Sequence, residues 1–331
     1  MIPSVASVTV VYNGAKVLPR QIDALLGQAR ALQEIVVVDN ASTDGTGAML
    51  AQRYPQVTVL RMGKNEGAAG AWAKGLSYAA LEKGHDWVWS FDDDSVPSPN
   101  VLTTMLEGIG SLNGTQAEVG MVAPMPLHRE TGIYYPPLLW QNGFVKPSTE
   151  RMQNPLWFAD LIILSGCLIR REVVREIGLP RADFFMDFFD FEYSLRTRSH
   201  GYKIAVIASA ELHHEIGNAR KVWWGSRQRL WPGYAPWREY YYSRNIAYAG
   251  WHLYPNLGTK RFVLGHLARH AGAVLLFSPK KTACLRKMAQ GFWDGCQAKL
   301  GIRFTPDGHA SNGRNGAARK PGKVQSEDGR A

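Results

Sequence analysis

Four short runs of apolar residues recur in the first hundred positions, and each is separated from the next by a segment long enough for a helix. The apolar runs cover residues 7–11, 34–39, 57–61 and 86–91, and the intervening segments cover residues 18–32, 43–54 and 71–83. Runs that are apolar at nearly every position are typical of strands covered on both faces. Because strands and helices alternate, the sequence predicts an α/β fold with a mostly parallel sheet flanked by helices.

The chain beyond these runs is less regular. A helix is expected to begin at Ser98 and Pro99, because serine caps helices and proline suits their first turn. Residues 119–123 predict another strand, and residues 159–178 predict a strand that runs into a helix. Residues 129–156 show little periodicity and predict an irregular insertion. The end, from about residue 305 to 331, is rich in Gly, Arg, Lys, Ser and Asn and predicts a disordered tail.

Length and cysteine content limit the class of protein. A chain of 331 residues suits one large domain with an extension, or two small domains. Cys167, Cys284 and Cys296 are too few and too widely spaced for a disulfide framework or a metal knuckle. The N-terminus lacks a charged region followed by a long apolar one, so no signal peptide is expected. A reducing, cytoplasmic location is the simplest interpretation.

Charge is distributed unevenly along the chain. The net charge is −5 over residues 1–217, +13 over residues 218–303 and +2 over the remaining 28 residues, which gives the total of +10. An acidic front half and a strongly basic segment predict two different roles.

Within the basic segment, residues 222–254 are dense in Trp, Tyr and Arg. Such a surface suits nucleic acid, through phosphate pairing and base stacking, and it equally suits a membrane interface or an isoprenoid-diphosphate acceptor. Simple packing of helices by their aromatic faces is a further alternative. Residues 261–277 are too short, and too interrupted by Arg269, to span a bilayer, although they could lie in one.

Polar clusters follow all four apolar runs: YNG at 12–14, DNASTDGT at 39–46, NEGAAGAW at 65–72 and DDDSVP at 92–97. Ligands of parallel sheets bind beyond the carboxyl ends of the strands. Asp39 closes the second run, where nucleotide-binding sheets carry an acidic residue that binds ribose or base. Ser42 and Asp44 also suit Asx turns and a helix cap, and the glycine run is weak on its own.

The aspartate triplet is the strongest of these clusters. In an extended segment, Asp92 and Asp94 point to the same side while Asp93 points elsewhere. Mg²⁺ or Mn²⁺ commonly joins one or two carboxylates to substrate phosphates. A solvated acidic turn is the alternative, but the position beside the nucleotide candidates favours metal and diphosphate binding.

The motifs VTVVYNG, VVVDNASTDGT, NEGAAGAW and FDDDSVP, in this order and spacing, resemble the nucleotide-diphospho-sugar half of family 2 glycosyltransferases, which have the GT-A fold. The resemblance covers roughly residues 5–220. NEGAAGAW with a triple aspartate is most similar to the galactofuranosyl- and rhamnosyltransferase-like branch. The resemblance implies a GT-A domain at 1–217, with donor binding in 1–97 and the acceptor and catalytic part in 98–217. A basic, aromatic, helical extension at 218–304 would follow.

The resemblance also implies roles for individual residues. Asp92, Asp94 and His214 would hold Mg²⁺ or Mn²⁺, with His214 preferred to the neighbouring His213. The residues implied to bind the nucleotide-sugar are Tyr12, Asn13, Asp39, Asn40, Ser42, Asn65, Gly67, Gly70 and Asp93.

The catalytic base is expected within residues 184–202, FFMDFFDFEYSLRTRSHGY. Where many relatives carry Glu-Asp, this chain has Phe-Asp, so the resemblance makes Asp190 the base. Helical spacing predicts that Phe188, Phe191 and Leu195 form a core-facing stripe that leaves Asp187 and Asp190 on the other side. Glu192 falls nearer the apolar stripe and is expected to be buried and paired, for instance with an arginine.

The implied activity is an inverting, metal-dependent transfer of rhamnose, galactofuranose or a similar sugar from a UDP- or dTDP-sugar. The acceptor would be a glycan or a polyprenyl-diphosphate-linked sugar, and the enzyme would sit peripherally at the inner face of the cell membrane, with no nucleic-acid partner. A sugar-nucleotide nucleotidyltransferase is an alternative, although VVYNGAKVLPR is a poor triphosphate-binding loop. An inactive GT-A-fold binding module for membrane or nucleic acid is another.

Overall fold

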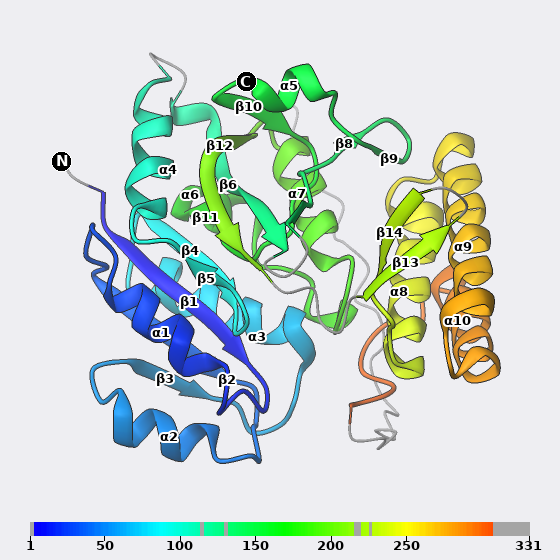
Figure 1. Cartoon of the computed structure of the whole chain (residues 1–331), viewed down its shortest axis with the longest axis horizontal. Coiled ribbons are helices and arrows are strands. Elements are labelled where there is room, and N and C mark those ends of the chain that lie inside the picture. The colour runs from blue at the N-terminus through cyan, green and yellow to red at the C-terminus, as the bar shows by residue number, and fades with distance from the viewer. Residues whose placement is uncertain (1–2, 113–115, 129–131, 215–219, 225–226, 307–331) are drawn as a thin grey trace, which may run out of the picture.

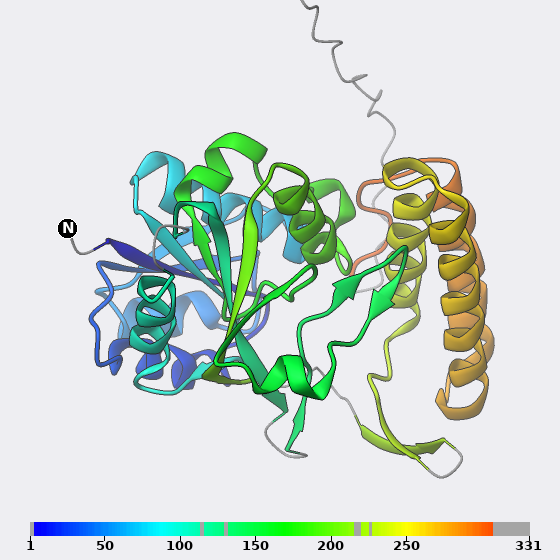
Figure 2. The same ribbon diagram turned by 90° about the horizontal axis from the view of Figure 1, so that it is seen from above.

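A computed structural model describes residues 3–112, 116–128, 132–214, 220–224 and 227–306 (Figure 1). Within these residues, helices cover both faces of one large sheet, and a layer of helices from the C-terminal segment stands beside it (Figures 1 and 2). The expected tail falls almost wholly in residues 307–331, which lie outside the described residues.

The large sheet has the strand order β10-β12-β6-β11-β4-β1-β2-β3. Its strands are β1 (Val5–Val11), β2 (Glu34–Asp39), β3 (Thr58–Arg61), β4 (Trp87–Asp92), β5 (Val96–Pro97), β6 (Val119–His128), β7 (Ile133–Tyr134), β10 (Leu156–Ala159), β11 (Leu168–Arg170) and β12 (Lys203–His213). The block β4-β1-β2-β3 is parallel, as predicted, and β6 is parallel to β12, whereas β11 joins the two blocks by antiparallel pairing. Every residue of β1 is buried, which confirms that both of its faces are covered.

Seven helices accompany this sheet in the described residues: α1 (Leu18–Leu26), α2 (Thr46–Arg53), α3 (Gly67–Leu76), α4 (Val101–Gly110), α5 (Thr149–Gln153), α6 (Arg171–Ile177) and α7 (Phe189–Ser199). Shorter turns are η1 (Ser77–Glu82), η2 (Gln116–Glu118) and η3 (Ala182–Phe184). One buried cluster packs α1, α2 and α4 on one face, and another packs α3, α6 and α7 on the opposite face.

Two local expectations are corrected. The helix expected at Ser98 and Pro99 begins at Val101, with Asn100 at its N-cap, because Val96–Pro97 first pairs with β12. The insertion at 129–156 is not wholly irregular: the described residues form β7, the hairpin β8 (Leu139–Trp140) and β9 (Phe144–Val145), and α5.

The C-terminal extension starts with a hairpin and continues as helices. Its elements are β13 (Arg220–Trp224), β14 (Arg227–Trp231), α8 (Pro236–Tyr248), η4 (Ala249–Leu253), α9 (Leu257–Phe277) and α10 (Lys281–Cys296). A side chain at Gly291 or Gly295 would overlap the backbone of α8, so these glycines let α8 and α10 pack closely. None of the described helices is both long enough and apolar enough to cross a bilayer.

Candidate active site

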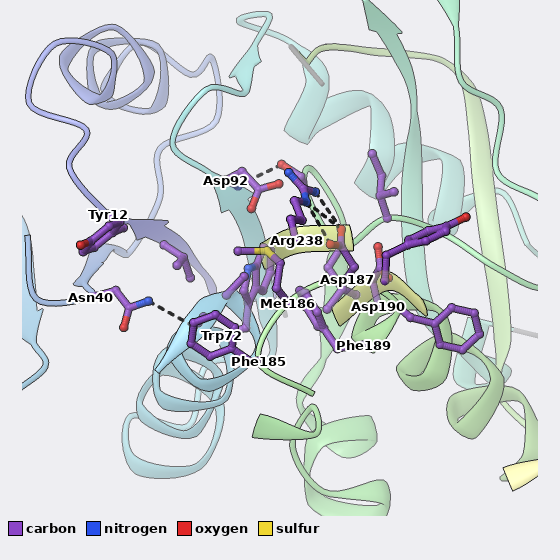
Figure 3. Close-up of a pocket in the computed structure, with 18 of the residues that line it drawn as sticks. Tyr12, Asn40, Trp72, Asp92, Phe185, Met186, Asp187, Phe189, Asp190 and Arg238 are labelled. Carbon is purple, nitrogen blue, oxygen red and sulfur yellow. Dashed lines mark hydrogen bonds and ion pairs between the residues drawn. The ribbon is translucent and has the colours of Figure 1, made fainter. Parts of the chain in front are cut away.

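A cavity of about 530 Å³ lies beyond the carboxyl ends of β1, β2 and β4 (Figure 3). Its walls also include the start of α3, the segment that leads into α7, and α8. Most of the site residues expected from the sequence line it: Tyr12, Asn40, Asn65, Gly67, Asp92, Asp93, Asp94, Asp190 and His214. In Figure 3, Tyr12 and Asn40 lie at one end of the cavity, and Asp187 and Asp190 lie at the other.

The aspartate triplet and His214 form one cluster at the end of β4 and β12. Asp92, Asp94 and His214 each offer a ligand atom within 4.8 Å of the other two. The ring of His214 is fixed by Ser95, whose Oγ lies 2.6 Å from Nδ1, and the same nitrogen is 3.3 Å from Asp94 Oδ1. His213, the residue not preferred by the sequence, does not line the cavity.

The electrostatics of this cluster fit a divalent cation. Burial raises the pKa of Asp92, and repulsion from Asp94 adds to this effect although His214 opposes it. Burial, together with Asp94 and Asp92, raises the pKa of Asp93 to about 7. Asp94 Oδ1 is buried and accepts no hydrogen bond from the described residues. Crowded, desolvated carboxylates, one with an oxygen that accepts no hydrogen bond from the described residues, are a suitable oxygen-ligand set for Mg²⁺ or Mn²⁺.

The backbone of the triplet is held by neighbours that sequence reasoning did not single out. Gln21 is buried in α1 and donates from Nε2 to the carbonyl oxygens of Asp92 and Ser95, the latter at 2.8 Å. A side chain on Gly14 would overlap Asp93 Oδ2 and Val11 Cγ2, so the side chain of Asp93 would have to shift. A glutamine on the apolar face of α1 was the available sequence signal for Gln21.

Asn40 ties the end of β2 to the glycine-rich segment. Its Nδ2 donates to Asn65 Oδ1 at 3.0 Å and to the Gly67 carbonyl at 3.1 Å, and its Oδ1 accepts from Glu66 N. Gly67 has a positive φ of 73°, and a side chain there would overlap the Phe185 carbonyl. Gly67 is therefore required by packing against the segment that precedes α7.

The start of α3 is less available to an anion than the sequence suggested. The amide of Gly67 donates to Asn65 Oδ1 at 2.8 Å, and the amide of Ala69 donates to the Phe185 carbonyl at 3.1 Å. Two of the amides that a diphosphate would use thus already have protein acceptors.

Four of the expected donor-binding residues lie outside the cavity lining. Asn13 and Ser42 join the first two polar loops, because Asn13 N donates to Ser42 Oγ at 2.9 Å. Asp39 is fully buried, and its Oδ1 accepts from Ser42 N at 2.9 Å. Its Oδ2 accepts no hydrogen bond from the described residues and lies 4.0 Å from Arg61 Nε. A side chain on Gly70 would overlap Glu66 Cβ. Contact of these four residues with a ligand stays a prediction.

Asp190 lies at the first turn of α7 and faces the cavity. Its Oδ1 accepts from Phe191 N at 2.8 Å. Burial raises the pKa of Asp190 to about 7, with Asp187 and Asp92 adding to the rise and the Phe191 amide opposing it. A carboxyl group with a pKa near neutrality is suited to exchange protons at physiological pH.

The expected stripe on this helix is partly wrong. Phe188 and Leu195 are buried as expected, whereas Phe191 is only half-buried. α7 begins at Phe189, with Phe188 as its N-cap, and it also buries Phe189 and Tyr193. The reason is a left-handed backbone at Phe188, which no helical period predicts. The expectation for Glu192 is confirmed: it is buried and accepts from Arg196 Nε at 2.9 Å.

The extension supplies a wall of the cavity that sequence reasoning missed. Tyr234, Trp237, Arg238 and Tyr242 line it. Arg238 donates from Nε and Nη2 to Asp187 at 2.8–3.1 Å, and its guanidinium lies 4.3 Å from the centroid of the Tyr234 ring. Figure 3 shows Arg238 between Asp92 and Asp187. The only signal in the sequence was the dense mixture of Trp, Tyr and Arg at 222–254.

Comparison with known proteins shows a family and several relatives of the chain. Residues 7–178 match the model of the family described as "Glycosyl transferase family 2". The chain is 27% identical over 246 residues to the dTDP-rhamnosyl transferase RfbF of Shigella flexneri. The aligned region covers 73% of this chain and 78% of that protein. The chain is 28% identical over 262 residues to the galactofuranosyltransferase GlfT1 of Mycobacterium tuberculosis, covering 75% and 82%.

The name of a third relative states its acceptor. The N-acetylglucosaminyl-diphospho-decaprenol L-rhamnosyltransferase of Mycobacterium tuberculosis is 24% identical over 234 residues, covering 63% of this chain and 75% of that one. Among solved structures, the mannosyltransferase PcManGT of Pyrobaculum calidifontis, in complex with GDP-Man and Mn²⁺, superposes with a TM-score of 0.55 at 18% identity, over 90% of this chain and 88% of that one. That likeness shows a shared fold.

Proposed function

The chain belongs to glycosyl transferase family 2 and is a glycosyltransferase, and from this premise we propose that it transfers a sugar, with inversion, from a nucleotide-diphosphate donor to a hydroxyl group of a glycan or lipid-linked acceptor. One observation carries the proposal: the ligand trio Asp92, Asp94 and His214 shares a single cavity with Asp190. A donor diphosphate and a reacting hydroxyl group can therefore bind in the same cavity.

On the donor side, Asp92, Asp94 and His214 would hold Mg²⁺ or Mn²⁺, which when bound neutralises the diphosphate of the donor and of the departing nucleotide. Ser95 orients His214 through Nδ1, and Gln21 fixes the backbone of the triplet. The buried Oδ2 of Asp39, which accepts no hydrogen bond from the described residues, is suited to accept from a ribose hydroxyl or a base N–H.

On the acceptor side, Asp190 removes the proton of the attacking hydroxyl group. The oxygen then attacks the anomeric carbon from the side opposite the nucleotide, which inverts the configuration, and no covalent sugar intermediate is needed. The Phe191 amide keeps the carboxylate of Asp190 at the cavity wall. The named relatives support a dTDP- or UDP-linked donor, with rhamnose or galactofuranose as the first sugars to test and a polyprenyl-diphosphate-linked acceptor.

A panel of nucleotide sugars tests this proposal. With Mn²⁺ present, a dTDP- or UDP-sugar at about 100 times its Kd should stabilise the folded chain by about 2.7 kcal/mol, which is a rise in Tm of several degrees. The same sugar should be transferred to a glycan acceptor with inverted anomeric configuration, as read by NMR. Stabilisation by nucleoside triphosphates, with release of pyrophosphate when a sugar phosphate is added, would instead indicate a nucleotidyltransferase.

The extension also carries a surface suited to an anionic bilayer. Exposed apolar and basic side chains occur on two neighbouring parts of the extension, the β13–β14 hairpin and the turn between α9 and α10; we name this set the docking edge: Lys221, Trp223, Leu275, Leu276, Lys280 and Lys281. Trp223 and Leu276 are each 63% exposed. The hairpin and the turn are joined by the contact of Trp231 with Phe277, whose ring centroids are 6.0 Å apart.

The docking edge suits a membrane because of its charge and its place. Residues 218–303 carry a net charge of +13, and tryptophan with leucine beside lysine is typical of segments that settle at the headgroup level. Tyr234, which lines the cavity, follows the hairpin directly. Binding of the inner leaflet at this edge would bring a lipid-linked acceptor to the α8 wall of the site, and the enzyme would be cytoplasmic and peripheral.

We expect the full chain to sediment with vesicles that contain about one-third phosphatidylserine. It should dissociate from them as the salt concentration is raised, because salt screens the charges. Lys280→Glu with Lys281→Glu should weaken the vesicle binding at least tenfold and leave transfer to a soluble acceptor unchanged. Arg261→Glu with Lys299→Glu, an exposed basic pair elsewhere on the extension whose replacement changes the net charge by the same amount, is the control. Equal binding by both variants, concentration-dependent dimerisation through this edge, or preference for nucleic acid would each overturn the docking edge while leaving the glycosyltransferase activity untouched.

A further inference from the structure

The segment that leads into α7 has an unusual backbone. Phe185, Asp187 and Phe188 have φ values of 63°, 59° and 65°, although none is glycine. At Phe185, with ψ at −60°, the amide of Met186 donates to the Phe184 carbonyl at 2.7 Å, which forms the rare positive-φ γ-turn. Such positions cost about 1–3 kcal/mol each and persist only where surrounding structure holds them.

Asn245 on α8 is one of the groups that hold this segment. Its Nδ2 lies 3.0, 2.7 and 2.8 Å from the carbonyl oxygens of Phe184, Met186 and Asp187. The amide has two N–H groups, so at least one of them is shared between two of these oxygens. Asn245 is completely buried, so these contacts are not shared with water. One amide group therefore fixes the orientation of three carbonyls across the left-handed stretch.

Arg244, the preceding residue, is the second group. Its Nη2 donates to the carbonyl oxygens of Asp183 and Phe184 at 3.0 and 2.8 Å, and its Nε donates to Asn245 Oδ1 at 2.8 Å. Arg244 is also completely buried, and no ion pair joins it to a carboxylate among the described residues. A buried guanidinium is costly unless all its N–H groups are bonded, and here backbone carbonyls take the place of a counter-ion.

The same segment is anchored on its other side to the donor-binding half. The Phe185 carbonyl accepts from Ala69 N at 3.1 Å and occupies the space that a side chain on Gly67 would need. The segment thus lies between α3 and α8, and it ends at Phe188, the N-cap of α7. Asp190 is the second residue of α7, so its position depends on this arrangement.

We propose that Arg244 and Asn245 are positioning residues that set the place of Asp190 relative to the metal ligands, so that the C-terminal extension is a component of the catalytic site. This inference rests on the proposed function of Asp190. The extension would then have a role distinct from membrane docking, because its helix α8 holds the reacting carboxylate through the backbone of residues 183–188. A displacement of about 1 Å at a reacting group can lower a rate about 10²-fold.

The test uses the full chain with Asn245→Ala and Arg244→Lys. Each should lower kcat at least tenfold, while the KM for the nucleotide sugar and the Mn²⁺-dependent rise in Tm change less than threefold. Asn256→Ala is a control on the same extension: Asn256 caps α9 by accepting from Thr259 N at 2.8 Å, so its loss destabilises the extension without touching residues 183–188. Asn245→Asp, which keeps the volume but removes the amide donors, should behave like Asn245→Ala.

A double-mutant cycle separates positioning from general damage. In an Asp190→Asn background, Asn245→Ala should reduce the residual transfer less than threefold, because it acts through Asp190. The proposal would be overturned if the falls in kcat caused by Asp190→Asn and Asn245→Ala multiply in the double variant. A kcat unchanged by Asn245→Ala, or an equal fall in kcat in Asn256→Ala, would also overturn it. Failure of the proposed function is seen separately, as a wild-type chain that neither binds nor transfers any nucleotide sugar.

Discussion

Asp190→Asn should lower kcat about 10²–10⁴-fold, the range that a positioned general base contributes, while donor binding is retained. Asparagine keeps the size of the side chain and cannot accept the proton of the attacking hydroxyl group. The hydrogen bond from the Phe191 amide to Oδ1 can still form, so α7 should remain in place. The measurement is kcat for sugar transfer beside the donor-dependent rise in Tm.

The pH profile gives this prediction a second readout. Since burial, Asp187 and Asp92 raise the pKa of Asp190 to about 7, the carboxyl is protonated below that pH and cannot act as a base. The wild-type rate should therefore rise with pH through about 7 and level off above it. The residual rate of the asparagine variant should lack this rise.

The control is Asp183→Asn, which changes a more exposed carboxylate, paired with Arg181, on the same segment. Its kcat should stay within about twofold of wild type, because Arg244 donates to the backbone carbonyl of Asp183 and this hydrogen bond does not involve the Asp183 side chain. Near-normal transfer by Asp190→Asn would show that another group takes the proton and would refute the mechanism.

The features that follow a short sequence period could be predicted, because local geometry determines them. The apolar run that becomes β1 is buried throughout. Asp92 and Asp94 do lie together with His214, but the expectation that Asp93 points elsewhere is wrong: β4 ends at Asp92, residues 93–94 form a turn, and Asp93 lines the same cavity. The pairing of Glu192 with Arg196 follows the four-residue spacing of a helix in the same way.

The features that depend on distant contacts could not be predicted. Phe188 is not a residue type that favours a left-handed backbone, so helical spacing did not reveal that Phe189 is buried and Phe191 only half-buried, although Phe188 itself is buried as expected. The cause lies about sixty residues away, in the buried side chains of Arg244 and Asn245. The ion pair of Asp187 with Arg238 also joins segments whose proximity no local pattern reveals.

Loss of the metal site should have an effect comparable to loss of Asp190. Asp94→Asn and His214→Gln should each abolish the Mn²⁺-dependent rise in Tm and lower transfer about 10²-fold or more, since the cation supplies several kcal/mol of charge stabilisation and about 1.4 kcal/mol corresponds to tenfold in rate. Chelation of the wild-type protein should have the same effect, and added Mn²⁺ should restore activity in the wild type alone.

Glu211→Gln is the matched control for this prediction. Glu211 lies on β12 only three residues before His214, yet its carboxylate accepts from the Tyr134 hydroxyl and does not line the cavity. Removing its charge leaves the ligand trio intact, so both the Tm shift and the rate should stay near wild type. Because Asp94→Asn keeps the volume of the side chain and relieves repulsion at Asp93, it should not destabilise the metal-free protein. A fall in Tm without metal, together with an unchanged Mn²⁺ response, would mean that Asp94 supports the fold and that the diphosphate is neutralised elsewhere.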